Sequence, residues 1–301
     1  ILSGLVGSEM CIRDRLETVQ PLPYPLPNGS FGFFTELHAI PMTWLVINPN
    51  TSVDVTDRLV ARIRRVAHGN IELRAETARF GAPYIASESS YAVAGHAVLD
   101  AWQNQGRIHE SLAVDPYEDG LVPAGTPLKG ILVGCFGDPG CAALQEISGI
   151  PVAGLAEASF EESCVFGHFV VVTGGVLWKP MLKKLAASLG YGKRLLDVHV
   201  LDQTGDELAA HPLQASDRLR QACVEAIAAT GADAVILGGA GLTGLADAWS
   251  SSLRVPVIDS VDAGVRMLAQ RIVRFEAEGG VPSPLAPHPK LLAWPEGRSH
   301  A

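Results

Sequence analysis

Short apolar runs alternate with amphipathic stretches from Thr43 onward, and this alternation predicts an α/β fold built on parallel strands. After the first apolar run, Trp44–Asn48, the apolar residues from Val55 to Val66 recur at helical spacing, and Ser52 before them is a candidate N-cap. The alternation continues along the chain in the same manner. The runs that we expect to be strands are Trp44–Asn48, Ile71–Ala75, Gly130–Gly134, Phe169–Thr173, Leu195–Leu201, Ala234–Gly238 and Val255–Asp259.

An internal repeat is the most informative feature of the sequence. Ile131–Gly137 (ILVGCFG) recurs as Val235–Gly241 (VILGGAG), and Ile150–Gly154 recurs as Val255–Asp259. Because both units recur in order, we expect two pseudo-symmetric lobes, each a parallel sheet flanked by helices. Ligands collect beyond the carboxyl ends of parallel strands, so the active site is expected in the cleft between the lobes. The expected division assigns residues 42–138 and about 256–276 to lobe 1, and residues 139–255 to lobe 2.

The two ends of the chain differ from the part between them. Residues 1–41 contain five prolines and no helical periodicity, and their first letters, ILSGLVGSEMCIRDR, look like translated adapter sequence. We therefore expect a non-native or disordered extension there, with the native protein starting at Met42. Residues 277–301 carry three glycines and five prolines, which predicts an irregular C-terminal tail.

Composition and charge narrow the class of protein. The chain has 301 residues, 48% of them apolar, and a net charge of −9 with no basic block. This balance argues against a nucleic-acid-binding domain or an anionic-lipid surface, and the apolar run Phe169–Trp178 is too short to span a membrane. We expect a small-molecule substrate, no nucleic-acid partner, no membrane association and a homo-oligomer.

The five cysteines are odd in number and show no paired CxxC spacing. A disulfide framework and a cysteine zinc site are therefore disfavoured, and a cytoplasmic location is expected. The histidines show no metal-binding spacing, and no serine-hydrolase elbow or P-loop is present. We expect no metal site.

Cys135 is the candidate for acid/base chemistry. It ends an apolar strand and precedes Phe-Gly-Asp-Pro-Gly and the helical pattern Cys141–Ile147. The positive end of that helix would favour a thiolate, and Gly137 and its neighbours would leave backbone N–H groups for an anion. The alternative is a buried core cysteine, since free cysteine is among the most buried residue types. The mirrored loop at Gly239 favours the functional interpretation.

Two further strand ends offer polar groups. In Ile47–Ser52 (INPNTS), Asn50 and Thr51 are able to bind a carboxylate or imide oxygen, but the same residues also suit an ordinary turn and N-cap. Thr173 ends another strand before two glycines and offers a hydroxyl to the cleft, or it is simply a satisfied turn threonine.

A dinucleotide site is the minor alternative. Gly239–Gly244 fits G-x-G-x-x-G, and Asp259 lies 20 residues beyond Gly239 at a strand end. The motif is weak by itself, occurs late in the chain, and has a cysteine-bearing twin that a pyrophosphate site does not need.

Six motifs occur in order along the chain: VINPNTS (46–52), VGCFGDPG (133–140), PVAGLAEAS (151–159), VVVTGG (170–175), ILGGAGLTG (236–244) and VPVIDSVDAG (255–264). With them the chain resembles the aspartate/glutamate/hydantoin racemase superfamily, closest to its hydantoin and allantoin racemase branch. The resemblance implies two α/β lobes, no cofactor, and two cysteines that exchange the α-proton from opposite faces of the substrate. It also implies that the substrate is surrounded by Asn48, Asn50, Thr51, Phe136, Gly137, Thr173, Gly174, Gly239, Ala240 and Gly241.

The sequence departs from this family at Gly239, where members that racemise carry the second cysteine. We expect a cofactor-independent, hydantoin racemase-like enzyme that uses Cys135 as acid/base on a small carbon acid such as a 5-substituted hydantoin. The enzyme alternative is a single-cysteine lyase like arylmalonate decarboxylase, which keeps the other cysteine, or a one-face proton exchanger. The non-enzyme alternative is an inactive protein that binds a small acid or imide.

Overall fold

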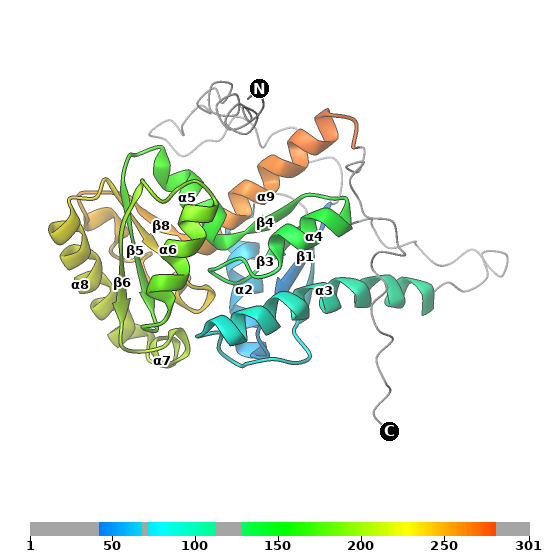
Figure 1. Ribbon diagram of the computed structural model, residues 1–301, viewed down its shortest axis with the longest axis horizontal. Helices are drawn as coiled ribbons and strands as arrows, with labels where there is room; N and C mark the ends of the chain where they lie inside the picture. Colours follow the sequence, from blue (N-terminus) through cyan, green and yellow to red (C-terminus); the bar gives the residue numbers. More distant parts are fainter. Residues whose placement is uncertain (1–41, 68–70, 112–127, 281–301) are drawn as a thin grey trace, which may run out of the picture. The chain divides into compact units, whose positions relative to one another are not determined.

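The computed structural model describes residues 42–67, 71–111 and 128–280, which form two four-stranded parallel sheets flanked by helices (Figure 1). The first sheet has the order β2-β1-β3-β4, with β1 at Met42–Asn48, β2 at Ile71–Thr77, β3 at Leu128–Val133 and β4 at Val152–Gly154. The second sheet has the order β6-β5-β7-β8, with β5 at Phe169–Gly174, β6 at Leu195–Leu201, β7 at Ala234–Leu237 and β8 at Val257–Asp259. The α/β class and the two parallel sheets are confirmed.

The strands next to the middle of each sheet are the most apolar, because helices cover both of their faces. Every residue of β5 and β7 is buried. The helices of the described ranges are α2 (Val53–Val66), α3 (Glu88–Ser111), α4 (Cys141–Ser148), α5 (Leu155–Cys164), α6 (Trp178–Ser188), α7 (Gly205–Ala210), α8 (Pro212–Thr230) and α9 (Ser260–Ala277). Two 3₁₀ turns, η2 (Ala240–Leu242) and η3 (Ser250–Ser252), follow β7.

All seven expected strands form, with ends that differ by up to two residues. The eighth, β4, is part of the repeat but is absent from the expected strands, because three residues give too short an apolar pattern to recognise. Ser52 is the N-cap of α2 as expected, although its side chain makes no capping hydrogen bond. The expectations for residues 1–41 and for the tail beyond residue 280 lie outside the described residues.

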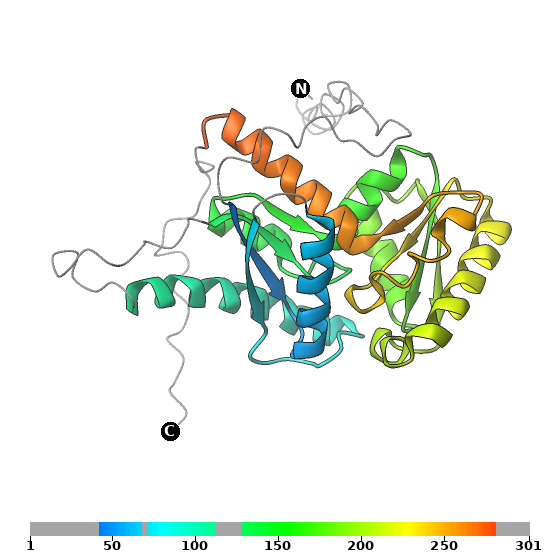
Figure 2. The same cartoon turned by 180° about the vertical axis from the view of Figure 1, so that it is seen from behind.

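The two sheets exchange one helix each, and this changes the division into lobes. Helix α5 follows β4 of the first sheet but packs against β5, β7 and β8 of the second, whereas α9 follows β8 and packs against β3 and β4. Figure 2 shows α9 running back over the first sheet. The helices α5 and α9 also pack against each other.

Strand membership therefore differs from the expected boundaries. The expected division places residues after 138 in lobe 2, but β4 pairs with β3 in the first sheet. The same division places residues from about 256 in lobe 1, but β8 pairs with β7 in the second sheet. The reason is that a strand–crossover–strand unit returns to its own sheet, so only the helix that follows the last strand is free to pack elsewhere.

Two expectations from the sequence concern disulfide bonds and membrane-spanning helices in the described residues. Their four cysteines, Cys135, Cys141, Cys164 and Cys223, are all free. Among the described helices, none is both long enough and apolar enough to cross a membrane.

Candidate active site

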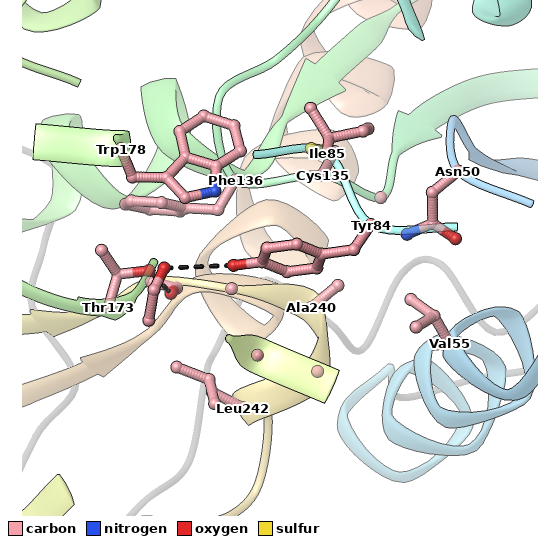
Figure 3. Close-up of a pocket in the computed structure, with 16 residues that line it drawn as sticks. Asn50, Val55, Tyr84, Ile85, Cys135, Phe136, Thr173, Trp178, Ala240 and Leu242 are labelled. Carbon is pink, nitrogen blue, oxygen red and sulfur yellow. Dashed lines mark hydrogen bonds between the residues drawn. The ribbon is translucent and has the colours of Figure 1, made fainter. Parts of the chain in front are cut away.

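A pocket lies where the carboxyl ends of β1, β3, β5 and β7 come together (Figure 3). Parallel strands bring their carboxyl ends to one edge, which is why residues from both sheets line the same space. The lining residues are Asn50, Val55, Tyr84, Ile85, Gly134, Cys135, Phe136, Thr173, Gly174, Trp178, Gly205, Gly238, Gly239, Ala240, Gly241 and Leu242.

Aromatic rings packed on glycines hold the two repeated loops against each other. A Cβ on Gly238 would lie 2.3 Å from Cε1 of Phe136, and a Cβ on Gly137 would lie 2.6 Å from Cζ3 of Trp178. Phe136, in the loop after β3 of the first sheet, contacts Gly238 of the second sheet. In the other direction, Trp178 of α6, which follows β5 of the second sheet, contacts Gly137 in the loop after β3. Both glycines are therefore needed for the loops to approach.

Cys135 lies just beyond the end of β3 and lines the pocket with only 8% of its surface exposed. Burial raises the pKa of its thiol well above the usual value, and the nearby carboxyl of Asp138 raises it further. Burial and the Asp138 charge therefore act against the effect expected from the start of α4, and both favour the thiol form of Cys135.

Asp138 is a buried carboxyl held at the start of α5. Its two oxygens accept hydrogen bonds from the amides of Ala156 at 2.8 Å and Glu157 at 2.7 Å. Burial raises its pKa to about 7 in spite of these bonds. Gly154 has no side chain and so makes room for the Asp138 carboxyl, since a Cβ on Gly154 would lie 2.3 Å from Cγ of Asp138. The Cys135 loop is thereby fastened to α5.

Gly239 occupies the position that corresponds to Cys135 in the second loop. Its φ of +140° belongs to a conformation that residues with side chains rarely adopt, and its amide donates to Ser260 Oγ at 3.3 Å. A Cβ at Gly239 would meet only Leu242, at 3.4 Å, so the pocket has room beside it. The second loop thus presents backbone and no acid/base side chain at this position.

Most of the expected site residues line the pocket: Asn50, Cys135, Phe136, Thr173, Gly174, Gly239, Ala240 and Gly241. Figure 3 shows the amide of Asn50 directed into the pocket. Thr173 donates its hydroxyl to the carbonyl of Gly238 at 2.7 Å, so it also has the structural role of a satisfied threonine. Their contact with substrate stays a prediction.

Three expected residues do not line the pocket. Asn48 is fully buried, and its Nδ2 lies 2.9 Å from both Asn50 Oδ1 and the Ser52 carbonyl, so it stabilises the turn. The amide of Thr51 donates to the carbonyl of Ala82 at 3.2 Å. Gly137 lies beneath the Trp178 ring, and its amide stabilises the charged form of the Asp138 carboxyl.

Sequence reasoning misses two aromatic residues of the pocket, Tyr84 and Trp178. Tyr84 lies in the loop between β2 and α3, and its hydroxyl donates to the carbonyl of Gly174 at 3.1 Å. The only sequence signal is an aromatic residue next to Pro83 in a loop. Trp178 begins α6, where its apolar character suggests nothing beyond core packing.

The dinucleotide alternative does not have the structure it requires. After β7 the chain forms the three-residue turn η2 in place of a long helix that would bind a pyrophosphate. Asp259 accepts hydrogen bonds from Thr243 Oγ1 at 3.0 Å and from the amide of Gly244 at 2.8 Å. Its carboxyl is thus occupied within the protein. Within the described ranges, no group of three or more His, Cys, Asp or Glu side chains is placed to hold a metal ion.

Comparisons with known proteins agree with the α/β fold of two parallel sheets. The model of the family described as Asp/Glu/Hydantoin racemase matches residues 45–268. A hydantoin racemase of Pseudomonas sp. (strain NS671) is 30% identical over 229 residues, which cover 76% of this chain and 84% of that protein. A hydantoin racemase of Paenarthrobacter aurescens is 28% identical over 227 residues, covering 75% of this chain and 89% of that protein. The solved structure of allantoin racemase from Klebsiella pneumoniae superimposes with a TM-score of 0.68 at 28% identity, covering 86% of this chain and 96% of that one.

Proposed function

Because the chain belongs to the Asp/Glu/hydantoin racemase family, we propose that it is a cofactor-independent racemase that exchanges the α-proton of a hydantoin-like carbon acid. One observation carries the assignment of the acid/base: Cys135 is a free thiol that lines the pocket between the two repeated loops. The similarity to hydantoin and allantoin racemases supports the substrate class.

The lining of the pocket suits a small ring with carbonyl and N–H groups. Asn50 offers an amide, and Ala240 and Gly241, as the first residues of η2, offer backbone N–H groups without partners inside that turn. Val55 and Ile85 supply apolar surface. A 5-substituted hydantoin matches this mixture, with its imide oxygens and nitrogens toward the polar groups.

The proposed chemistry is proton transfer at the ring carbon that carries the substituent. Cys135, once ionised, removes the proton, and the electron pair of the broken C–H bond moves onto the neighbouring carbonyl oxygen. Amide donors stabilise that developing enolate, which is where such sites derive much of their rate. Because burial raises the pKa of Cys135, the ionised fraction grows with pH, so kcat/KM should rise from pH 6 to 9.

The test follows separate D- and L-5-substituted hydantoins in D₂O, with loss of the Cα–H signal by NMR and optical rotation measured together. Cys135→Ala should slow proton exchange by about 10²–10⁴-fold. Cys164→Ala is the matched control, since Cys164 is a free cysteine that does not line the pocket, and it should retain wild-type exchange. Exchange that survives Cys135→Ala unchanged would sink the assignment of the acid/base.

A second candidate function is favoured by Gly239, which leaves one thiol in the pocket. A lone thiol supports proton exchange on a single face, or the single protonation that follows decarboxylation of a disubstituted malonate. Deuterium uptake from one enantiomer with retained rotation, or CO₂ release from an arylmalonate, would favour these activities over racemisation. Binding of hydantoin that survives Cys135→Ala, with no turnover by either protein, would indicate a binding protein.

A further inference from the structure

A racemase needs an acid/base on each face of its substrate, and Cys135 serves only one. We propose that Tyr84 is the second catalytic acid/base, acting on the face opposite Cys135; this inference rests on the proposed racemase function. Among the described residues that line the pocket, only Cys135 and Tyr84 have side chains able to release and take up a proton for this chemistry. Tyrosine is one of the side chains that enzymes use as a general acid or base.

Tyr84 is held by contacts on both sides of its loop. The carbonyl of Ala82 accepts a hydrogen bond from the amide of Thr51 at 3.2 Å. On the other side, Ser90 Oγ accepts hydrogen bonds from the amides of Ala86 and Ser87, both at 3.0 Å, just before the start of α3. The loop therefore presents the phenol from a defined backbone position.

The phenol of Tyr84 reaches from the first half of the chain to the strand ends of the second. Its hydroxyl donates to the carbonyl of Gly174 at 3.1 Å, at the end of β5. The absence of side chains makes room for the ring, since a Cβ on Gly175 would lie 3.0 Å from the hydroxyl and one on Gly205 3.4 Å from Cε2. The phenol thus lies on the side of the pocket formed by β5 and α7.

This position places the phenol beside the loop that lacks a thiol. Gly174, which holds the Tyr84 hydroxyl, follows Thr173, whose own hydroxyl is bonded to the carbonyl of Gly238. Gly238 directly precedes Gly239. In the view of Figure 3, the Tyr84 ring lies between Cys135 and the loop of Ala240, with its hydroxyl toward Thr173. Because Gly239 carries no side chain, that side of the pocket has room for a group supplied by Tyr84.

The proton transfers balance without another reactant. In one direction, the Cys135 thiolate takes the α-proton as the C–H bond breaks and an S–H bond forms. The electron pair rests on the enolate oxygen until the Tyr84 O–H bond breaks and its proton forms the new C–H bond on the opposite face. The enzyme is left with a thiol and a phenolate, the form that acts on the other enantiomer. Proton exchange with solvent between turnovers, in which the thiol loses a proton and the phenolate gains one, restores the first state.

The experiment compares exchange with inversion in D₂O, using Tyr84→Phe, which keeps the ring and removes only the hydroxyl. We expect racemisation to fall by about 10²-fold or more. Deuterium uptake from the enantiomer that faces Cys135 should stay within about threefold of wild type, with retained rotation, because one thiol still exchanges its own face. Tyr191→Phe is the matched control, since Tyr191 lies outside the pocket lining, and it should behave as wild type.

The outcomes separate this inference from the function on which it rests. Parallel loss of exchange and racemisation in Tyr84→Phe would overturn the acid/base role, because a residue that only closes the pocket affects both equally. Unchanged racemisation would overturn it as well. A wild-type protein that exchanges no proton from either hydantoin would instead overturn the proposed function.

A measurement on the unaltered protein makes the test independent of how the variant folds. Early in the reaction in D₂O, inverted product made by two acid/bases carries deuterium, because its new proton comes from Tyr84 and not from the substrate. Inverted product that keeps the original hydrogen indicates one acid/base that moves the same proton between the two faces, and would overturn the role of Tyr84.

Discussion

Asp138 is the charged residue that acts on the thiol of Cys135, and its own environment explains how. Its carboxyl is buried, receives two backbone hydrogen bonds at the start of α5, and follows Cys135 by three residues. A negative charge at this place disfavours a thiolate nearby. Asp138 is therefore a positioning residue that fastens the Cys135 loop, and its negative charge adds to the burial that raises the pKa of the Cys135 thiol.

Asp138→Asn should move the alkaline rise of kcat/KM to lower pH, by about one pH unit. Removal of the negative charge eliminates one cause of the raised Cys135 pKa, while the amide keeps the size of the side chain. The measurement is the pH profile of hydantoin exchange for both proteins. A variant that is merely less stable, with the same pH profile, would show that the carboxyl does not act on the thiol.

Gly239→Cys tests the missing thiol of the second loop. A cysteine there has room, but the φ of +140° is unfavourable for any side chain, so we expect a loss of unfolding free energy of about 1–3 kcal/mol. In the Tyr84→Phe background, the new thiol should restore part of the inversion. Gly239→Ala carries the same backbone strain without the thiol. It should lower the thermal midpoint equally and restore no inversion, and restoration by alanine would argue against acid/base action at this position.

At the scale of elements, the features that can be predicted from the sequence are those that a local pattern of residues determines, such as a strand and the loop that follows it. Cys135 and Gly239 each follow an apolar strand, so the repeat by itself is enough to place both loops at the carboxyl ends of strands. Tyr84 escapes prediction because its place in the pocket depends on how the β2–α3 loop crosses to β5, a long-range contact. The exchange of α5 and α9 between sheets escapes it for the same reason, since it is decided by packing surfaces.

The short helix α7 links element stability to the pocket. Thr204 Oγ1 accepts from the amide of Glu207 at 3.2 Å, and Glu207 accepts from the amide of Thr204 at 2.8 Å, which forms a capping box. The first residue of α7, Gly205, lines the pocket beside Tyr84. Loss of the capping box should therefore affect the pocket through Gly205.

Thr204→Ala should destabilise α7 by about 1 kcal/mol and raise KM several-fold with little change in kcat. Faster hydrogen exchange at the amides of Glu207 and Leu208 would report the loosened turn. Thr230→Ala is the matched control, because Thr230 Oγ1 donates to the carbonyl of Ala226 near the end of α8, away from the pocket lining. Equal changes of KM in both variants would show that α7 does not position the site.

At the scale of the whole molecule, the buried Arg62 connects α2, which flanks the first sheet, to residues that follow β7 and β8 of the second sheet. Arg62 is bonded to both oxygens of Asp262 at 2.6 Å and to Asp247 at 2.8 Å, and it lies 3.7 Å from Asp259. Its side chain is only 8% exposed. Asp259 in turn holds Thr243 and Gly244 in the loop that begins at Gly239. This cluster therefore joins the two halves next to the pocket.

Arg62→Met should lower the free energy of unfolding by about 3–5 kcal/mol, because it leaves carboxylates of a half-buried cluster without their cation. Burial already raises the pKa of Asp259, and loss of Arg62 raises it further, so protonation of the folded state recovers stability at low pH. The loss should be larger at pH 8 than at pH 5, as measured by urea unfolding. Arg65→Met is a strict control: Arg65 lies on the same helix and bonds to the same Asp247, but it is 66% exposed and should cost under about 1 kcal/mol. Equal losses in the two variants, or a loss that grows as pH falls, would mean that Arg62 does not hold the halves together through these carboxylates.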